Sequence, residues 1–326
     1  MNFAIIGCGL IGQKRLRALQ KEHNILATAD VNLDRAKSLA QQAPGAIATA
    51  EWREAVELPG VDAVIVATTN NWLAPITIAA AQAGKHVLVE KPAGRTGAEL
   101  RPALDAAERT RAYVQVGFNH RFHPGLQKAK AIVESGVLGP LMFIRGRYGH
   151  GGRVGYDREW RADPVIAGGG ELLDQGVHLI DLARWFLGEF EVVEGHAGTY
   201  FWDMPVDDNA FLSLRTKSGQ TAWLHATCTE WKNMFSFEIY GRVGKLQVDG
   251  LGGSYGVERL SHYQMRPQMG PPETTIWEYP GEDTSWSLEL STFLSSIADG
   301  VSRGPDLRDA LAALDIVETI YNSSKE

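Results

Sequence analysis

The sequence predicts an α/β protein in which a doubly wound parallel sheet is followed by an α+β domain with a large, open and mainly antiparallel sheet. Three observations predict this class. The length of 326 residues exceeds the usual size of one core, so about two domains are expected. Short apolar runs alternate with helical patterns over the first 120 residues. Beyond residue 190, strand patterns follow one another without helices between them.

The first half contains six short apolar runs, each followed by a turn or by a helical pattern. The runs cover residues 2–6, 25–29, 47–49, 61–67, 86–89 and 113–118. The helical patterns between them cover residues 13–21, 36–42, 51–57, 74–83 and 97–110. The run 61–67 is nearly all apolar and rich in β-branched residues, which is typical of a parallel strand covered on both faces.

The pattern changes after Pro124. A helix over 125–135 leads to a strand over 141–148, and the glycine run 168–170 opens a helix over 171–187. Strands separated by turns then occupy residues 191–276, and two helices close the chain over 286–298 and 307–321. The sequence therefore divides into two domains, residues 1–121 and residues 122–326.

Composition limits the classes of function. A chain that is 44% hydrophobic and 22% charged can form real cores, which excludes a disordered or collagen-like protein. The net charge of −7 argues against a general nucleic-acid binder. The two cysteines, Cys8 and Cys228, provide neither a disulfide framework nor metal-ligand spacing, so no metal and a cytoplasmic location are expected. No membrane span or secretory leader is recognised.

The segment Gly7-x-Gly9-x-x-Gly12 follows a strand and opens a helix. This spacing allows a tight turn, close approach of the backbone to a pyrophosphate, and packing of the helix on the strand. Asp30 ends the second strand, where its carboxylate can accept hydrogen bonds from the adenosine ribose and repels a 2′-phosphate. NAD is therefore expected and NADP is disfavoured, although Arg35 allows some tolerance of phosphate. Three glycines that merely serve a tight turn are the competing interpretation.

Glu90-Lys91-Pro92 ends the fifth strand at the carboxyl edge of the sheet, where ligands bind in such folds. A lysine at this position can reach a substrate. A solvated Glu-Lys pair that caps the strand is the alternative, and the pattern by itself does not separate the two.

Polar residues recur at spacings of three and four along the helix that follows the triple glycine, namely Glu171, Asp174, His178, Asp181 and Arg184. Asp174 and His178 are one turn apart and share a face. The water-facing side of an amphipathic helix has the same pattern. A histidine one turn from a carboxylate suits proton transfer near neutral pH, which favours a catalytic interpretation.

The glycine turn, Glu90-Lys91-Pro92 and the segment Gly168-Gly169-Gly170-x-Leu172-x-Asp174-x-Gly176-x-His178-x-x-Asp181 together resemble the glucose-fructose oxidoreductase, inositol dehydrogenase and rhizopine-catabolism family, Gfo/Idh/MocA. The resemblance covers nearly the whole chain. It implies a Rossmann domain that binds a nicotinamide cofactor, a substrate held against the open face of the antiparallel sheet, and a homodimer or homotetramer formed through that sheet. It also implies that Lys91, Asp174 and His178 are the catalytic residues.

The expected cofactor contacts come from the glycine turn and from the loops that follow the second, fourth, fifth and sixth strands. They are Gly7, Cys8, Gly9, Leu10, Ile11, Gly12, Asp30, Thr68, Thr69, Asn70, Glu90, Lys91 and Asn119. The segment Thr68-Thr69-Asn70-Asn71 departs from the Thr-Pro-Asn-His of many relatives. The expected substrate contacts are Lys91, Tyr148, Trp160, Arg161, Asp174 and His178.

Several further residues have two interpretations. The arginines of residues 145–161 suit an anionic sugar, yet alternating arginines on a strand are more often its exposed side. Trp202, Trp223 and Trp231 are expected on the sheet, in packing or in a subunit interface. His120 and His123 are expected to be structural.

The predicted function is NAD-dependent interconversion of a secondary hydroxyl and a ketone on a sugar, a cyclitol or a sugar derivative, which can be nucleotide-linked. In this prediction His178 transfers the proton of the substrate hydroxyl, while Asp174 orients His178 and Lys91 assists it. Two alternatives remain open: a non-catalytic regulator that senses NAD or sugar, and a glycosidase of the same family that uses NAD transiently.

Overall fold

The computed structural model describes residues 1–19 and 23–324, which divide into two compact units. Unit 1 comprises residues 1–118, 165–168 and 286–315, and unit 2 comprises residues 119–164, 169–285 and the chain from residue 316 on. Each unit is described by itself below.

Unit 1 contains a six-stranded parallel sheet, in the order β3-β2-β1-β4-β5-β6. Its strands are β1 (Asn2–Ile6), β2 (Asn24–Ala29), β3 (Ile47–Thr49), β4 (Ala63–Val66), β5 (His86–Glu90) and β6 (Val114–Gly117). The direction of the chain through the sheet reverses between the neighbouring strands β1 and β4, because the connection after β1 leads to β2 on one side and the connection after β4 leads to β5 on the other. Ligands of doubly wound folds bind beyond the carboxyl ends of the strands at such a reversal.

Helices connect the strands of unit 1, as the alternating pattern predicts. They are α1 (Leu10–Leu19), α2 (Leu33–Ala40), α3 (Trp52–Glu57), α4 (Asn70–Gln82) and α5 (Gly97–Thr110). The first helix was predicted to extend to residue 21, and its last two residues lie outside the described residues. Phe3, Ile5 and Ile65 are fully buried in the core, and all four residues of β4 are buried, as expected for a strand covered on both faces.

Unit 2 contains an eight-stranded sheet, in the order β14-β13-β12-β11-β7-β10-β9-β8. Its strands are β7 (Leu141–Gly149), β8 (Phe190–Gly198), β9 (Asn209–Thr216), β10 (Thr221–Thr227), β11 (Met234–Gly241), β12 (Gly244–Asp249), β13 (Glu258–Gln264) and β14 (Glu273–Tyr279). Only β7 and β10 pair in parallel, which agrees with the expected mainly antiparallel sheet.

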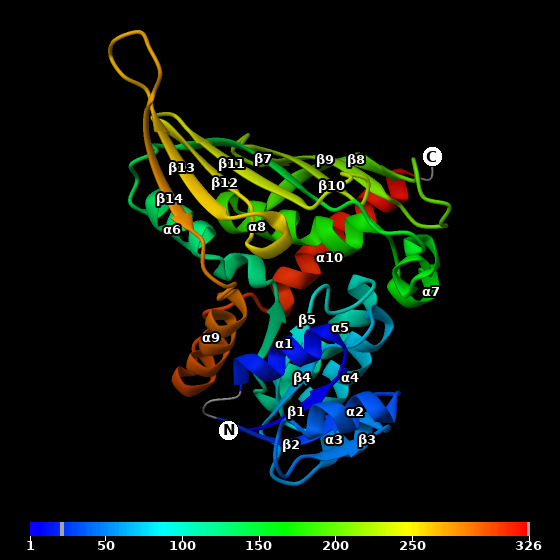
Figure 1. The fold of residues 1–326 in the computed structure, drawn as a ribbon. Helices are drawn as coiled ribbons and strands as arrows, with labels where there is room; N and C mark the ends of the chain where they lie inside the picture. Colours follow the sequence, from blue (N-terminus) through cyan, green and yellow to red (C-terminus); the bar gives the residue numbers. More distant parts are fainter. Residues whose placement is uncertain (20–22, 325–326) are drawn as a thin grey trace. The chain divides into compact units, whose positions relative to one another are not determined.

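The helices of unit 2 include α6 (Pro124–Glu134) and α8 (Val177–Leu187), which cover one face of this sheet (Figure 1). Short helical turns are η1 (Asn119–Phe122), η2 (Tyr156–Arg158), η3 (Trp160–Ala162), η4 (Leu172–Gly176) and η5 (Gly253–Tyr255). The division between the two units falls inside three further helices, which are α7 (Pro164–Ala167), α9 (Ser285–Asp299) and α10 (Leu307–Ser323).

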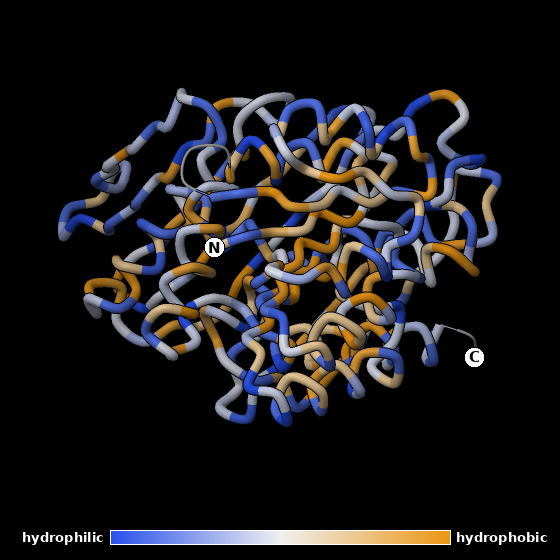
Figure 2. The backbone as a smooth tube through the Cα atoms, turned by 90° about the horizontal axis from the view of Figure 1, so that it is seen from below, coloured by the Kyte–Doolittle hydropathy of each residue, from blue (hydrophilic) through white to orange (hydrophobic). Residues whose placement is uncertain are grey.

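Buried and partly exposed residues alternate strictly along β11, because one side chain in two faces the helices. In Figure 2 the long hydrophobic stretches, drawn in orange, follow strands and helices, while many of the outer turns are blue. No helix among residues 1–19 and 23–324 has the length and apolar character that a membrane span requires.

The expectation that three tryptophans lie on the sheet was wrong for two of them. Trp202 and Trp231 lie in loops, before β9 and before β11, and of the three only Trp223 lies on a strand. The helix predicted over 171–187 is confirmed in its extent, but η4 is one turn of π-helix and the α-helix proper begins at Val177. Such π-turns are frequent at functional sites.

Candidate functional site

In unit 1, the glycine turn between β1 and α1 has the shape that the spacing predicts. Gly7 has a φ of +92°, and a Cβ there would lie 2.2 Å from the carbonyl oxygen of Ala67. A Cβ on Gly12 would lie 2.0 Å from the carbonyl oxygen of Gly7. A Cβ on Gly9, by contrast, would meet nothing within 4 Å. Gly7 and Gly12 therefore make the turn, and Gly9 leaves open space beside the start of α1.

Asp30 stands at the end of β2, directly beside the glycine turn. Its carboxylate accepts hydrogen bonds from the amide of Cys8, at 2.8 Å, and from the amide of Asn32, at 2.9 Å. The side chain is partly exposed, which leaves lone pairs for a ribose hydroxyl. Burial, reinforced by the negative charge of Asp30, raises the pKa of the Cys8 thiol to about 12. Cys8 is therefore a neutral packing residue, as expected.

The loop after β4 lies next to the glycine turn, because Gly7 approaches Ala67 and the amide of Ala67 donates to Ile6. Thr68 and Thr69 are partly exposed there, and Asn70 begins α4. An open cradle at a helix N-terminus, a carboxylate at the end of β2 and a polar loop after β4 fit the pyrophosphate and ribose of a dinucleotide. The residues of unit 1 thus fit NAD.

Lys91 follows β5 and is partly exposed. Its neighbour Glu90 is buried and accepts a hydrogen bond of 2.7 Å from Nε of Arg15, a fully buried arginine that also pairs with Glu289. The alternative of a solvated Glu90-Lys91 pair is therefore wrong. Glu90 belongs to a buried ion-pair network inside unit 1.

The start of η4 in unit 2 is held by a carboxylate that the sequence analysis did not identify. Asp207 accepts hydrogen bonds from the amides of Gly170, at 2.9 Å, and Leu172, at 2.8 Å, and from the hydroxyl of Tyr321, at 2.7 Å. A Cβ on Gly170 would lie 1.9 Å from the backbone oxygen of Asp207, so this position must be glycine. The motif glycine thus lets the chain pass Asp207 and places Asp174 in the following turn.

Asp174 pairs with Arg161, whose Nε lies 3.1 Å from Oδ2 of the carboxylate. The guanidinium of Arg161 also lies over the ring of Trp160, at 4.5 Å from its centroid. Burial lowers the pKa of Arg161, but the charge of Asp174 and its hydrogen bond, together with Tyr156 and Glu171, outweigh burial and raise the pKa above its ordinary value. Three of the expected substrate residues therefore lie together in unit 2.

Glu171 lies beneath this pair and is only 1% exposed. The hydroxyl of Tyr156 donates to it at 2.8 Å, and Nε2 of His150 lies 3.5 Å from the same oxygen. Burial raises the pKa of Tyr156 far above its ordinary value, and the charges of Glu171 and Asp174 reinforce the effect. Tyr156 is thus a permanent hydrogen-bond donor.

His178 lies on the first turn of α8, buried against two aromatic residues. Its ring stacks on that of His120, with centroids 3.8 Å apart and planes 19° from parallel. Tyr148, at the end of β7, presents its ring at 5.9 Å from His178 and 4.9 Å from His120. Burial, and next the neighbouring Tyr255, raise the pKa of Tyr148 well above its usual value. Tyr148 was an expected substrate residue, whereas the position of His120 was missed.

The polar stripe of this helix does not face water. Glu171, His178 and Asp181 are buried, and Asp181 accepts a hydrogen bond of 2.8 Å from Nε of Arg121. The water-facing interpretation is therefore wrong. Asn119, an expected cofactor contact, is buried in unit 2 and donates to the hydroxyl of Ser285 at 3.1 Å. His123 lies 3.1 Å from Glu258, which fits its expected structural role.

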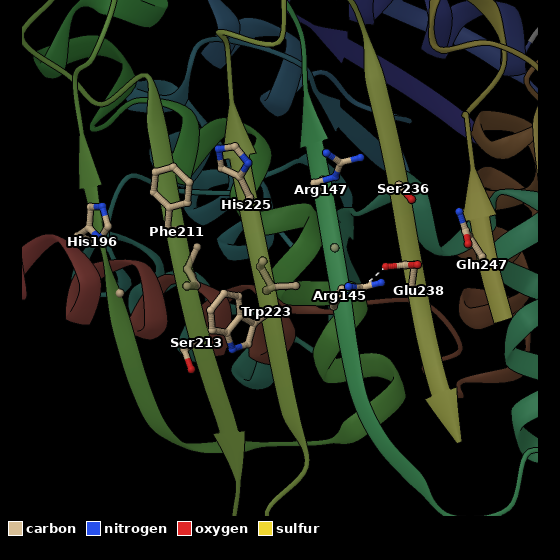
Figure 3. Close-up of a pocket in the computed structure, with 14 residues that line it drawn as sticks. Arg145, Arg147, His196, Phe211, Ser213, Trp223, His225, Ser236, Glu238 and Gln247 are labelled. Atoms are coloured by element: carbon tan, nitrogen blue, oxygen red, sulfur yellow. Dashed lines mark ion pairs between the residues drawn. The ribbon is translucent and has the colours of Figure 1, made fainter. Parts of the chain in front are cut away.

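A hollow of about 640 Å³ lies elsewhere in unit 2, on the sheet face opposite the helices (Figure 3). It extends across β8, β9, β10, β7, β11 and β12. Phe211 and His225 stack within it, 4.3 Å between centroids, and Trp223 is 66% exposed. Arg145 and Arg147 also lie on this face, which confirms that the strand arginines form an exposed side. No motif residue lines this hollow, so we do not assign the chemistry to it.

Among residues 1–19 and 23–324, no group of His, Cys, Asp and Glu side chains has the arrangement of a metal site. Histidine, carboxylate and lysine side chains such as His178, Asp174 and Lys91 are suited to proton transfer and to stabilising negative charge.

Two family models match the chain. The oxidoreductase family with an NAD-binding Rossmann fold matches residues 1–118. The GFO/IDH/MocA C-terminal domain matches residues 126–247.

The chain is also similar to curated proteins over most of its length. Inositol 2-dehydrogenase 2 of Saccharopolyspora erythraea is 31% identical, over 99% of this chain and 93% of that protein. Levoglucosan dehydrogenase of Pseudarthrobacter phenanthrenivorans is 28% identical, over 91% of this chain and 86% of that protein. Among solved structures, a levoglucosan dehydrogenase in complex with NADH and levoglucosan superposes with a TM-score of 0.89 at 27% identity, covering 100% of this chain and 97% of that one.

Proposed function

Because this chain belongs to the Gfo/Idh/MocA oxidoreductase family, we propose that it oxidises a secondary hydroxyl of a sugar or cyclitol, or reduces the corresponding ketone. The chain is an NAD-binding oxidoreductase. The observation that carries the assignment of substrate and residues is the buried polar cluster of unit 2. In this cluster Asp174 pairs with Arg161, the ring of Tyr148 contacts that of His178, and the charge of Asp174 acts on the Tyr148 hydroxyl, which supports the proposal.

In this proposal, residues 1–121 bind the cofactor and residues 122–326 bind the substrate. Gly7, Gly9 and Gly12 hold the pyrophosphate, Asp30 holds the adenosine ribose, and Thr68, Thr69, Asn70 and Asn119 complete the set of contacts. When bound, NAD supplies the hydride acceptor. Asp30 favours NAD over NADP, because its carboxylate repels a 2′-phosphate.

The protein's own part of the reaction is proton transfer and charge stabilisation. The imidazole of His178 takes the proton of the reacting hydroxyl, and the ammonium of Lys91 stabilises negative charge that develops on that oxygen. Asp174, fixed by Arg161, orients the hydroxyl. Stacking on His120 holds the ring of His178 in one orientation, which aligns its nitrogen for the transfer.

The proposed substrate is polyhydroxylated. Tyr148, Trp160 and Arg161 provide hydroxyl, ring and guanidinium groups beside Asp174 and His178. An apolar alcohol offers these groups no hydroxyls and would forgo the hydrogen bonds that a polyhydroxylated ring makes, each worth about 0.5–1.5 kcal/mol. The named substrates of the relatives, an inositol and levoglucosan, are rings of this kind. A nucleotide-linked sugar remains within the proposal because the guanidinium of Arg161, beside Asp174, is a cation that suits an anionic group.

We also propose that the chain forms a homodimer or homotetramer through the open face of the eight-stranded sheet. Trp223, Phe211 and Phe143 are large apolar side chains exposed on that face. Exposed aromatic patches of this kind are typical of protein contacts. A cytoplasmic location is part of the proposal, since both cysteines are free and buried.

The proposal is tested by measuring NADH formation with inositols, free hexoses, anhydro sugars, uronic acids and nucleotide-linked sugars. On the best substrate, Lys91→Ala and His178→Ala are each expected to lower kcat by about 10²- to 10⁴-fold. NADH binding should change little, and Lys217→Ala, at an exposed turn, serves as the matched lysine control.

Near-wild-type turnover of either variant would remove that residue from the mechanism. Activity confined to simple aliphatic alcohols would overturn the substrate class. Binding of a sugar without turnover of any kind would favour the sensing regulator. Release of a free sugar without net NADH would favour the glycosidase.

A further inference from the structure

Four aromatic rings form a continuous row in unit 2. Tyr156 lies 5.7 Å from Trp202, Trp202 lies 5.1 Å from Phe201, and Phe201 lies 5.1 Å from Trp231, measured between ring centroids. The planes meet at 51°, 83° and 67°, so each ring presents an edge or a tilted face to the next. This geometry is favourable for aromatic pairs and leaves ring faces open at the end of the row.

The row begins at the candidate site. The hydroxyl of Tyr156 donates to Glu171 at 2.8 Å, and the charges of Glu171 and Asp174 both act on that hydroxyl. Glu171 lies three residues before Asp174 at the start of η4. The aromatic row is thus continuous with the polar cluster assigned to the substrate.

The other end of the row is exposed to solvent. Phe201 is 55% exposed and Trp231 is 78% exposed. Trp231 also has a φ of +61°, the left-handed region that a bulky residue rarely adopts. Residues held in such rarely populated backbone conformations cluster at active sites and ligand-binding positions, so the strained backbone of Trp231 points to a role in binding.

The row is held rigidly. The amides of Phe201 and Trp202 donate to the buried carboxylate of Asp208 at 2.7 and 2.9 Å. The indole Nε1 of Trp202 donates to the carbonyl of Cys228 at 3.0 Å. A Cβ on Gly152 would lie 2.5 Å from the ring of Trp202, so glycine permits this close packing. The backbone at Phe201 and the ring of Trp202 are thus fixed in place, so the exposed rings beside them need less ordering when a ligand binds.

We propose that Phe201 and Trp231 form a second carbohydrate subsite, so that the substrate is a disaccharide or a glycoside with two rings. The inference rests on the proposed function and extends it to the substrate class. One ring reacts beside His178 and Asp174, and the other stacks its C–H face on the exposed aromatic rings. Glu230, Lys232 and Asn233 flank Trp231 in the chain and can bind the hydroxyls at the edge of that ring.

Binding separates this proposal from the proposed function. The full chain, with and without NADH, is titrated calorimetrically with cellobiose, maltose and trehalose, and with glucose as the one-ring reference. At least one disaccharide is expected to bind more tightly than glucose. Trp231→Gly keeps the left-handed backbone and removes the ring, so it should weaken disaccharide binding by about threefold to tenfold and leave glucose binding unchanged. Trp231→Phe should retain most of the preference.

The matched control is Tyr200→Ala. Tyr200 is the neighbour of Phe201 and is also exposed, but its ring contacts Phe211 instead of the row. This variant should keep the preference for disaccharides. Light scattering on each variant shows whether the rings contribute to self-association.

Equal binding of glucose and of every disaccharide would overturn the subsite, as would a Trp231→Gly variant with an unchanged preference. A change in oligomeric mass with no change in preference would assign the rings to a protein contact and would also overturn it. Absence of turnover on every sugar would contradict the proposed function alone, because the binding comparison does not depend on turnover.

Discussion

Asp207 and Asp208 are consecutive buried carboxylates that bind the backbone of two different loops. Asp207 accepts the amides of Gly170 and Leu172 and so fixes the turn that carries Asp174. Asp208 accepts the amides of residues 200, 201 and 202, at 2.8, 2.7 and 2.9 Å. A carboxylate has enough lone pairs for such sets of donors, and an amide of the same shape has only one oxygen. Single residues thus place both the polar cluster and the aromatic row.

We expect Asp208→Asn to lower the free energy of unfolding at pH 7 by about 1–3 kcal/mol, because buried amides lose their acceptor. Burial by itself raises the pKa of this carboxyl, but hydrogen bonds from Asn209 and the three amides outweigh it and hold the pKa below the ordinary value of 3.8. Its stabilising effect is therefore complete above that ordinary value and is lost as the pH falls through the lower folded value.

Urea unfolding followed by tryptophan fluorescence at a series of pH values measures this difference. The gap between the wild type and Asp208→Asn should be constant near neutrality and should close in acid. Asp203→Asn makes the same chemical change at an exposed position of the same loop and should have little effect. If the difference in free energy of unfolding between the wild type and Asp208→Asn stayed the same at the lowest pH, the ionised carboxylate of Asp208 would not be the source of the stabilisation.

At the scale of elements, the sequence predicts what local patterns and chain connectivity determine. The six strands of unit 1 and their parallel pairing follow from β-branched runs separated by helices. The motif glycines predict the turn after β1, because their required conformations are local. The π-turn at residues 172–176 was not predictable from local pattern, and the carboxylate that holds its start, Asp207, lies more than thirty residues later in the sequence. The stack of His120 on His178 joins segments that only the tertiary fold brings together.

Two glycines of the turn after β1 are expected to have different roles: Gly12 is needed for the fold, and Gly9 is needed for binding the cofactor. We expect Gly9→Ala to fold normally, because its Cβ meets nothing within 4 Å. The added methyl enters the space beside α1 that the pyrophosphate would occupy, so NADH binding should weaken by about tenfold or more. Gly12→Ala places a Cβ 2.0 Å from the oxygen of Gly7 and should instead lower the midpoint of thermal unfolding.

Fluorescence titration with NADH and circular dichroism distinguish the two variants. Loss of NADH affinity with an unchanged unfolding midpoint is expected only for Gly9→Ala. If that variant bound NADH as the wild type does, the glycine turn would not be the pyrophosphate site.

At the scale of the whole molecule, the open sheet face of unit 2 differs from the covered one in the chemistry that it presents. Rings of His196, Phe211 and His225 stack across three neighbouring strands, with centroids 5.1 and 4.3 Å apart. Arg145 pairs with Glu238 on the same face (Figure 3). Aromatic side chains with paired charges around them are typical of the contacts between subunits. In our proposal, the same strands therefore contribute one set of side chains to the polar cluster and the other set to an interface.

We expect the wild type to be a homo-oligomer and Trp223→Glu to reduce its mass, because a carboxylate introduced on this face would be desolvated without a partner in the assembled state. Multi-angle light scattering measures the mass, and NADH titration shows whether unit 1 remains intact. Trp72→Glu makes the same change at an exposed tryptophan on α4 of unit 1 and should leave the mass unchanged. A monomeric wild type, or an unchanged mass of Trp223→Glu, would exclude this face as the contact.

If Trp223→Glu dissociates and still oxidises sugar at the wild-type rate, the active site is complete in one chain and the interface serves stability alone.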